Sequence, residues 1–108
     1  MNDITNCEIR NTLDDEGHPT GGLVIRVGLD IEWQYGQLGP ADTRGSPNGA
    51  FVETVISAAL QRLQFYNNSE FRCRENSLAI THLEEALHWL EARTKDREKR
   101  NVEGTHTV

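Results

Sequence analysis

The segment that most constrains this chain runs from about residue 74 to residue 100, where apolar residues recur every three to four positions. Ile80, Leu83, Leu87 and Leu90 define one side of the helix that this spacing predicts. The predicted helix is on the order of 40 Å long, at roughly 1.5 Å per residue. A helix of this length with apolar residues on one side must pack that side against another element of the fold.

A second, shorter helix is predicted from about Ala50 to Phe65, with one apolar stripe and a break at Asn67-Asn68-Ser69. Asn48 is expected to cap its N-terminus. Two helices joined by a short polar turn form an antiparallel hairpin. Because the second helix is the longer, we expect its overhang to pack on a second copy of the chain.

Residues 23–35 have a different period, because every odd position is apolar and four of the even positions are polar or charged. Period two predicts one half-buried strand, kinked at Gly28. A weaker alternation in residues 5–13 and turn-forming residues in 14–22 predict an antiparallel partner for it.

The predicted fold class is therefore α+β, with an N-terminal antiparallel β-hairpin or small sheet followed by an antiparallel helical hairpin, in an oligomer. We expect a single domain. Residues 1–49 would form the β-hairpin region and a Gly/Pro-rich loop, and residues 50–108 the ligand-binding and oligomerisation region.

The net charge of -6 and the pI near 5.1 disfavour DNA, RNA and membrane surfaces as partners. No run approaches the roughly 20 apolar residues of a membrane span, and the first residues lack the features of a secretion signal. Cys7 and Cys73 form no CxxC motif, which is typical of a reduced, intracellular protein. We therefore expect a cytoplasmic location.

Positive charge is concentrated in residues 93–100, which hold five cations against two acids. Arg93, Arg97 and Arg100 share a helix face by their spacing, which fits phosphate binding, although spacing alone favours a salt-bridged helix end. At the other end of the same helix, Phe71 and its neighbours could stack and read a purine, or could be ordinary staple and surface residues. These candidates are Phe71, Arg74, Asn76 and the nearby Tyr66.

Neither a catalytic centre nor a metal or cofactor site is predicted. The four histidines lack metal-like pairing, and no nucleophile has an evident base beside it. The glycine-rich loop has neither the P-loop pattern nor the dinucleotide-binding one. We therefore expect a protein that is not an enzyme.

Four C-terminal segments carry a resemblance to a known family. They read Phe71-x-Cys73-Arg74-Glu75-Asn76-Ser77-Leu78-Ala79-Ile80-Thr81, Leu83-Glu84-Glu85-Ala86-Leu87-x-Trp89-Leu90, Arg93-Thr94-x-Asp96-Arg97-x-x-Arg100 and Val102-Glu103-Gly104-Thr105. This pattern resembles the phage Thoeris anti-defence protein 1 family, whose hairpin is related to that of the anti-CBASS protein 2 family. Asn101 departs from the pattern, which has Gly at that position.

This resemblance implies a phage sponge acting in the cytoplasm of an infected bacterium. Members of the family bind glycocyclic ADP-ribose, the Thoeris signal, without cleaving it. Some also bind CBASS cyclic di- or trinucleotides. They form dimers that assemble into hexamers, so a homodimer or homohexamer is expected here.

The family's ligand residues match Asn76 and Arg93 directly, with Phe71 or Tyr66 as the aromatic. Asn76 and Arg93 are 17 residues apart on one helix, roughly 25 Å. We therefore predict a pocket between two copies, where Asn76 of one meets Arg93 of the other. The alternatives are a helical protein-interaction module with no small-molecule ligand, and an enzyme that degrades a nucleotide signal.

Overall fold

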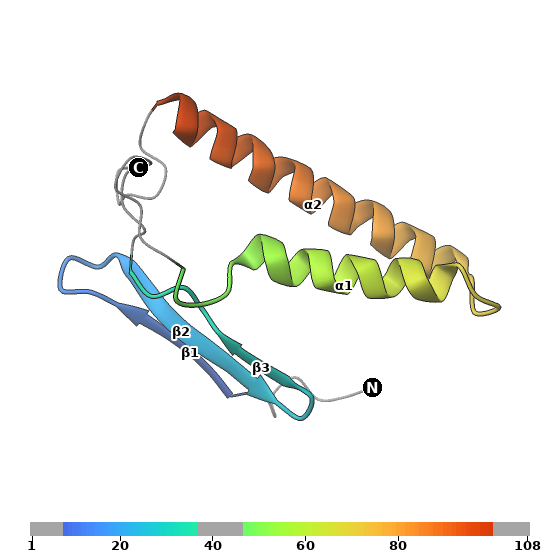
Figure 1. Ribbon diagram of the computed structural model, residues 1–108, viewed down its shortest axis with the longest axis horizontal. Helices are drawn as coiled ribbons and strands as arrows, with labels where there is room; N and C mark the ends of the chain where they lie inside the picture. The colour runs from blue at the N-terminus through green and yellow to red at the C-terminus, as the bar shows by residue number, and fades with distance from the viewer. Residues whose placement is uncertain (1–7, 37–46, 101–108) are drawn as a thin grey trace. The chain divides into compact units, whose positions relative to one another are not determined.

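The computed structural model describes residues 8–36 and 47–100. Within these ranges the chain forms, in order, β1 (Glu8–Leu13), β2 (Pro19–Arg26), β3 (Leu29–Glu32), α1 (Val52–Asn67) and α2 (Arg74–Lys99) (Figure 1). The three strands belong to one compact unit, and the two helices belong to another, Val52–Arg100. A three-stranded antiparallel sheet followed by two helices confirms the predicted α+β class.

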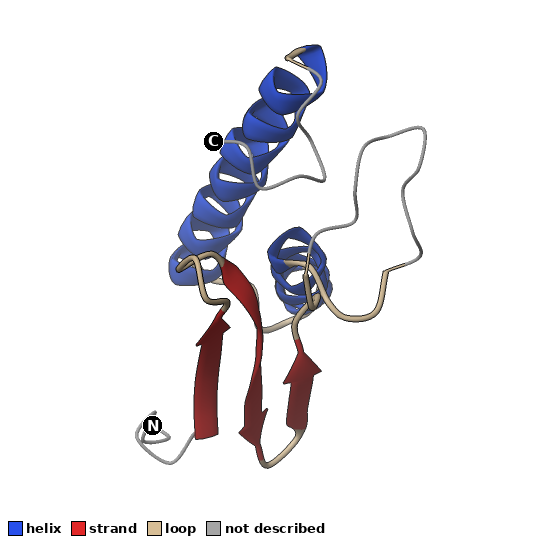
Figure 2. Ribbon diagram, turned by 90° about the vertical axis from the view of Figure 1, so that its left-hand side faces the viewer, coloured by secondary structure: helices blue, strands red, loops and turns tan. Residues whose placement is uncertain are grey.

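The strands form one sheet, with β2 in the middle and antiparallel to both neighbours (Figure 2). Asp14 holds the turn between β1 and β2, because its Oδ1 accepts the backbone N–H groups of Glu16 and His18, each at 2.9 Å. Gly17 lies in the same turn with a φ of 83°, a left-handed conformation that glycine adopts at little cost. The turn-forming residues of the sequence thus produce the predicted connection.

The prediction of one long strand over residues 23–35 is wrong, because the chain reverses at Val27-Gly28. Gly28 has a φ of 82°, and Arg26 pairs with Leu29 directly across the turn. This pairing sets odd positions of β2 opposite even positions of β3, so the odd positions of the two strands lie on opposite faces. Apolar side chains therefore occupy both faces: Leu23 and Ile25 on one, and Val24, Leu29 and Ile31 on the other.

The sequence predicted Asn48 as the N-cap of α1, and this prediction is wrong. The Asn48 side chain bonds instead to the segment after β3. Its Oδ1 accepts the N–H of Tyr35 at 2.8 Å, and its Nδ2 donates to the Tyr35 carbonyl at 3.2 Å. Ala50 forms a parallel bridge with Trp33. These bonds tie residues 48–50 to the segment after β3, and α1 begins at Val52.

Helices α1 and α2 form the predicted antiparallel hairpin (Figure 1). Helix α1 has 16 residues and α2 has 26, so about ten residues of α2 extend beyond α1. Neither described helix combines the length and hydropathy that a membrane-spanning segment needs.

The hairpin covers its apolar stripe only in part. Among residues 8–36 and 47–100, no hydrophobic side chain is fully buried. The half-buried apolar positions are Val55, Ile56, Leu60 and Leu63 of α1, and Ala79, Ile80, Leu83, Ala86, Leu87 and Leu90 of α2. In each helix these positions recur at helical spacing. The apolar residues from which the helices were predicted therefore also form the contact between them.

Candidate functional site

The turn between α1 and α2 gathers side chains that recognise planar anions. Residues 62–76 contain three arginines, three aromatic residues and four carboxamides. They are Arg62, Arg72 and Arg74; Phe65, Tyr66 and Phe71; and Gln64, Asn67, Asn68 and Asn76. Guanidinium groups bind phosphate, aromatic rings stack on bases, and carboxamides bond to base edges.

None of the three arginines of this turn forms an ion pair with a described residue. Among the described residues, no carboxylate oxygen lies within 4.0 Å of a guanidinium nitrogen of Arg62, Arg72 or Arg74. Arg72 instead donates from Nε to the backbone carbonyl of Asn67 at 3.0 Å. Residues 62–76 contain only two acids against the three arginines, so this turn has a net charge of +1 in a chain of net charge -6.

Asn67, the last residue of α1, fastens the turn to the start of α2. Its Nδ2 donates to the Oγ of Ser77 at 3.0 Å, and its Oδ1 accepts the backbone N–H of Cys73 at 3.2 Å. The side chain is half-buried between these partners. Sequence reasoning treated Asn67 only as a helix breaker and missed this bridging role, although its amide can donate and accept at once.

Asn76 is oriented by the first turn of α2. Cys73 is the N-cap, with φ -154° and ψ 164°, and its Sγ accepts the backbone N–H of Asn76 at 3.4 Å. The side-chain Nδ2 of Asn76 donates to the Phe71 carbonyl at 3.4 Å. This bond leaves Oδ1 of the amide as an acceptor for a ligand donor. Cys73 itself is a free, exposed thiol.

Two of the predicted aromatic contacts lie on the surface of the turn. Phe71 is 68% exposed and Tyr66 is 41% exposed. Ser69 ties both residues to the turn, because its Oγ donates to the Tyr66 carbonyl and accepts the Phe71 backbone N–H. Rings this exposed each offer a face for stacking.

A third aromatic residue and an arginine, which sequence reasoning did not single out, accompany Tyr66 on α1. The Arg62 guanidinium carbon lies 4.7 Å from the Tyr66 ring centre and 5.0 Å from that of Phe65. Its Nη2 also donates to the Tyr66 hydroxyl at 3.1 Å. The spacing of Arg62 to Phe65 and Tyr66, three and four residues apart, was the available signal, since it brings side chains together on a helix.

Beside the turn, the helical hairpin forms an open pocket of about 350 Å³. Its lining is mainly amide, because Gln64, Asn67 and Asn68 at the end of α1 face Ile80 of α2. Small-molecule sites of proteins begin at about this volume. The pocket thus adds hydrogen-bonding groups to the aromatic and guanidinium groups of the same turn.

The opposite end of α2 holds the other predicted cationic residues, in three different environments. Arg93 is exposed and has no ion-pair partner among the described residues. Arg97 is 7% exposed, so it is buried. Arg100 pairs with Asp96, four residues before it, at 3.2 Å. The three arginines therefore do not form one exposed patch.

The structure does not bring the two ends of α2 together within one chain. Arg74 and Asn76 lie in the first turn of α2, whereas Arg93 and Arg97 lie in its last two turns. The continuous helix separates Asn76 from Arg93 by roughly 25 Å, and turns their side chains about 100° apart around the axis. A ligand of nucleotide size can contact only one of these ends on a given chain.

Metal-ligating residues do not converge in the described parts of the chain. Residues 8–36 and 47–100 contain no group of three His, Cys, Asp or Glu side chains arranged to hold a metal ion. The contact of His82 with Glu85, at 3.9 Å, is a long and exposed pair on α2. Cys7 and His106 lie outside the described residues.

Comparison with known proteins identifies the family. The chain is 57% identical over 70 residues to a protein of Bacillus phage SBSphiJ7 called Thoeris anti-defense 1. This match covers 65% of the chain and 49% of the phage protein, so the chain spans about half the length of that relative. A family model described as "Acb2/Tad1, hairpin domain" matches residues 27–95, which include the α1–α2 turn and Arg93. The chain therefore belongs to the Acb2/Tad1 hairpin-domain family.

Proposed function

We propose that this chain is a phage anti-defence sponge that binds glycocyclic ADP-ribose and sequesters it without cleaving it, and so blocks Thoeris defence. The name of its relative, Thoeris anti-defense 1, supports the anti-defence role. The observation that carries the ligand class is the α1–α2 turn, where exposed aromatic rings, uncompensated arginines and carboxamides lie together. A cyclic ADP-ribose isomer has a binding partner for each kind of group. Its adenine stacks on the rings and bonds to the carboxamides, and its pyrophosphate binds the arginines.

In this proposal the base is held at the first turn of α2. Tyr66 or Phe71 stacks on the adenine, since both rings are exposed. Asn76 bonds to the edge of the base through its amide, which the Phe71 carbonyl orients at 3.4 Å. Arg74, exposed in the same turn, supplies positive charge to the phosphates.

In this proposal a second copy of the chain completes the ligand-binding pocket that begins at the first turn of α2. Arg93 and Arg97 lie about 25 Å and about 32 Å from Asn76 along α2, so on one chain they cannot contact the same nucleotide as Asn76. Antiparallel pairing of two α2 helices brings Arg93 of one copy to Asn76 of the other and creates two equal pockets per dimer. The half-covered apolar stripe of the helical hairpin supports such pairing.

Sequestration without turnover is stoichiometric, so the sponge lowers the free signal only when its pockets outnumber the signal molecules. It acts in the cytoplasm of the infected cell, where the signal is made. We extend the proposal to CBASS cyclic di- and trinucleotides, which present the same base and phosphate groups. Homodimers, or hexamers built from them, are the assemblies that this pocket requires.

Ligand capture by the purified full chain tests the proposal. The protein is incubated with glycocyclic ADP-ribose isomers, or with cyclic di- and trinucleotides, and filtered; the filtrate and the fraction released by heat are then assayed. Depletion of the filtrate and recovery of intact ligand after heating support a sponge. Recovery of a cleaved product identifies a degrading enzyme instead. No capture of any ligand contradicts the proposal and favours a protein-interaction module.

Two variants test the site, with one matched control. Asn76→Ala and Arg93→Ala are each expected to abolish capture while the assembly keeps its size by light scattering. Arg10→Met removes an exposed arginine of β1, which pairs with Glu8 at 2.8 Å, and is expected to capture ligand normally. Normal capture by both Asn76→Ala and Arg93→Ala would show that the site lies elsewhere.

A further inference from the structure

The α1 side of the turn holds a three-residue stack that the proposed contacts leave unexplained. We propose that Arg62 is a positioning residue for Tyr66: it fixes the orientation of the ring before the ligand arrives. This inference rests on the proposed function, because it assigns Arg62 a role in binding the same nucleotide signal. It adds a second residue of α1, beside Tyr66, to a site otherwise built from the turn and from α2.

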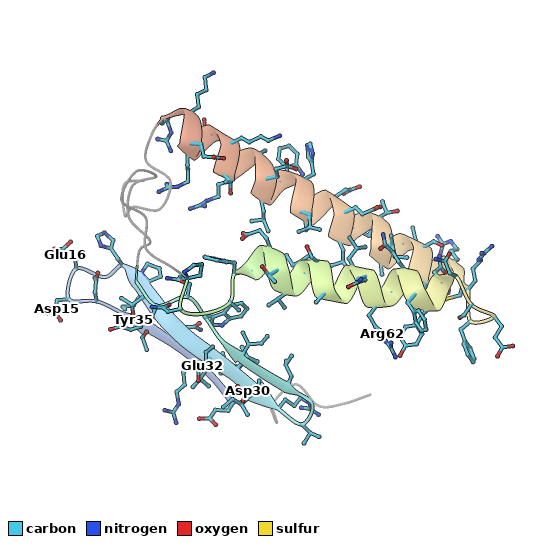
Figure 3. All side chains as sticks on the ribbon, viewed as in Figure 1. Asp15, Glu16, Asp30, Glu32, Tyr35 and Arg62 are labelled. Carbon is cyan, nitrogen blue, oxygen red and sulfur yellow. The ribbon has the colours of Figure 1, made fainter. Side chains whose placement is uncertain are left out.

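The geometry of the stack determines where Arg62 can act. The guanidinium carbon lies 4.7 Å from the Tyr66 ring centre and 5.0 Å from the Phe65 ring centre, so both rings contact one cation. The two rings are 6.0 Å apart and inclined by 59°, so they enclose the guanidinium rather than stack on each other. The Arg62 side chain projects from α1 away from α2 (Figure 3).

A hydrogen bond from Arg62 also orients the Tyr66 ring. Arg62 Nη2 donates to the Tyr66 hydroxyl at 3.1 Å, which restrains the far end of the ring while the cation–π contact restrains its face. Without these contacts, a tyrosine that is 41% exposed on a helix would sample several rotamers. An ordered ring loses less rotamer freedom on binding, so preorganisation by Arg62 strengthens the complex.

Arg62 is available for this role because no acid competes for it. Among the described residues, it has no carboxylate partner within 4.0 Å. Its guanidinium uses one of its five N–H donors on Tyr66. The cation therefore binds the rings themselves.

A double-substitution cycle on the full chain tests whether Arg62 acts through Tyr66. The dissociation constant of glycocyclic ADP-ribose is measured for the unsubstituted chain, Arg62→Met, Tyr66→Ala and the double variant. Arg62→Met alone is expected to weaken binding about three- to tenfold, and by less than about twofold in the Tyr66→Ala background. Arg10→Met removes the same charge from an exposed position on β1, where Arg10 pairs with Glu8, and is the matched control.

A second measurement is made on the ligand-free protein. It can therefore be carried out even if Tyr66→Ala binds the ligand too weakly for titration. Three-bond NMR couplings that report χ1 of Tyr66 are expected to show one rotamer in the unsubstituted chain and averaging in Arg62→Met. The side-chain N–H protons of Arg62 are expected upfield, because they lie over aromatic rings, and Tyr66→Ala is expected to reduce this shift.

Three outcomes decide between the proposals. Equal losses from Arg62→Met in both backgrounds identify a direct contact with the ligand and overturn the positioning role alone. A single Tyr66 rotamer retained in Arg62→Met overturns it too. Absence of binding by the unsubstituted chain overturns the proposed function, and the role of Arg62 with it.

Discussion

The Nδ2 of Asn67 donates to the Oγ of Ser77 at 3.0 Å, which joins the end of α1 to the first turn of α2 across ten residues of sequence. The same amide accepts the N–H of Cys73, the N-cap of α2. One side chain therefore sets where the second helix starts relative to the first. Since Asn76 lies in that first turn, Asn67 also sets the position of the amide proposed to bind the base.

Replacement of Asn67 by alanine is expected to lower the free energy of unfolding of the helical hairpin by about 1–2 kcal/mol, because two side-chain hydrogen bonds are lost at a half-buried position. Thermal unfolding followed at 222 nm measures the change. Asn68→Ala is the matched control, since the structure shows only backbone hydrogen bonds for Asn68. Equal losses from both substitutions would argue against the bridging role of Asn67.

Cys73→Ser is expected to stabilise the hairpin by about 0.5–1 kcal/mol, because serine is a strongly preferred N-cap and its oxygen accepts a better hydrogen bond than sulfur does. The present bond, from the Asn76 N–H to Sγ at 3.4 Å, is weak. The melting temperature by circular dichroism should rise for Cys73→Ser and fall for Cys73→Ala, which has no acceptor. A Cys73→Ser variant less stable than Cys73→Ala would exclude a capping role.

Gly22→Ala is expected to disrupt the pairing of β1 with β2, at a cost above about 3 kcal/mol. A Cβ at Gly22 would lie 2.1 Å from the Arg10 carbonyl oxygen, a backbone atom that cannot move away alone, and φ is 148°. Gly17→Ala is the control, since φ there is 83° with nothing within 4 Å of the added carbon. Only the left-handed backbone then costs energy, about 1–2 kcal/mol.

Amide hydrogen exchange of β2 compares the two glycine variants residue by residue. Protection should be lost throughout β2 in Gly22→Ala and largely kept in Gly17→Ala. If Gly22→Ala exchanged as slowly as the unsubstituted chain, the close approach of β1 at this position would be refuted.

Mixing Asn76→Ala with Arg93→Ala tests whether the proposed pocket is shared between two copies. A dimer of Asn76→Ala with Arg93→Ala has one pocket that lacks both groups and one that retains both. After co-refolding at equal amounts, random pairing gives about half mixed dimers, so about one quarter of all pockets should capture glycocyclic ADP-ribose. If each chain formed its pocket alone, the mixture would capture nothing, as each variant does separately.

The helices were predictable because their apolar residues repeat at a period that only a helix uses. The first was expected at 50–65 and lies at Val52–Asn67, and the second was expected at 74–100 and lies at Arg74–Lys99. The pairs Glu91–Lys95 and Asp96–Arg100, each four residues apart on α2, lie at 3.0 and 3.2 Å. Such contacts depend only on local geometry.

The strand reversal was not predictable from alternation alone, because apolar odd positions continue unbroken through Val27 and beyond Gly28. A two-residue turn leaves the sequence alternation intact while it exchanges the faces of the next strand. The bridging of Asn67 to Ser77 was missed for a related reason. It depends on the position of the end of α1 relative to the start of α2, and apolar periodicity does not determine that position.

Helix α2 is unbroken between Asn76 and Arg93, and its length therefore sets the distance between the two halves of the proposed pocket. Insertion or deletion of one residue within this interval would shift one end by about 1.5 Å and rotate it by about 100°. Neither paired copy could then meet the other's half-pocket correctly. Point substitutions on the outer face of α2 are tolerable in this arrangement, whereas a change in residue count between its two ends is not.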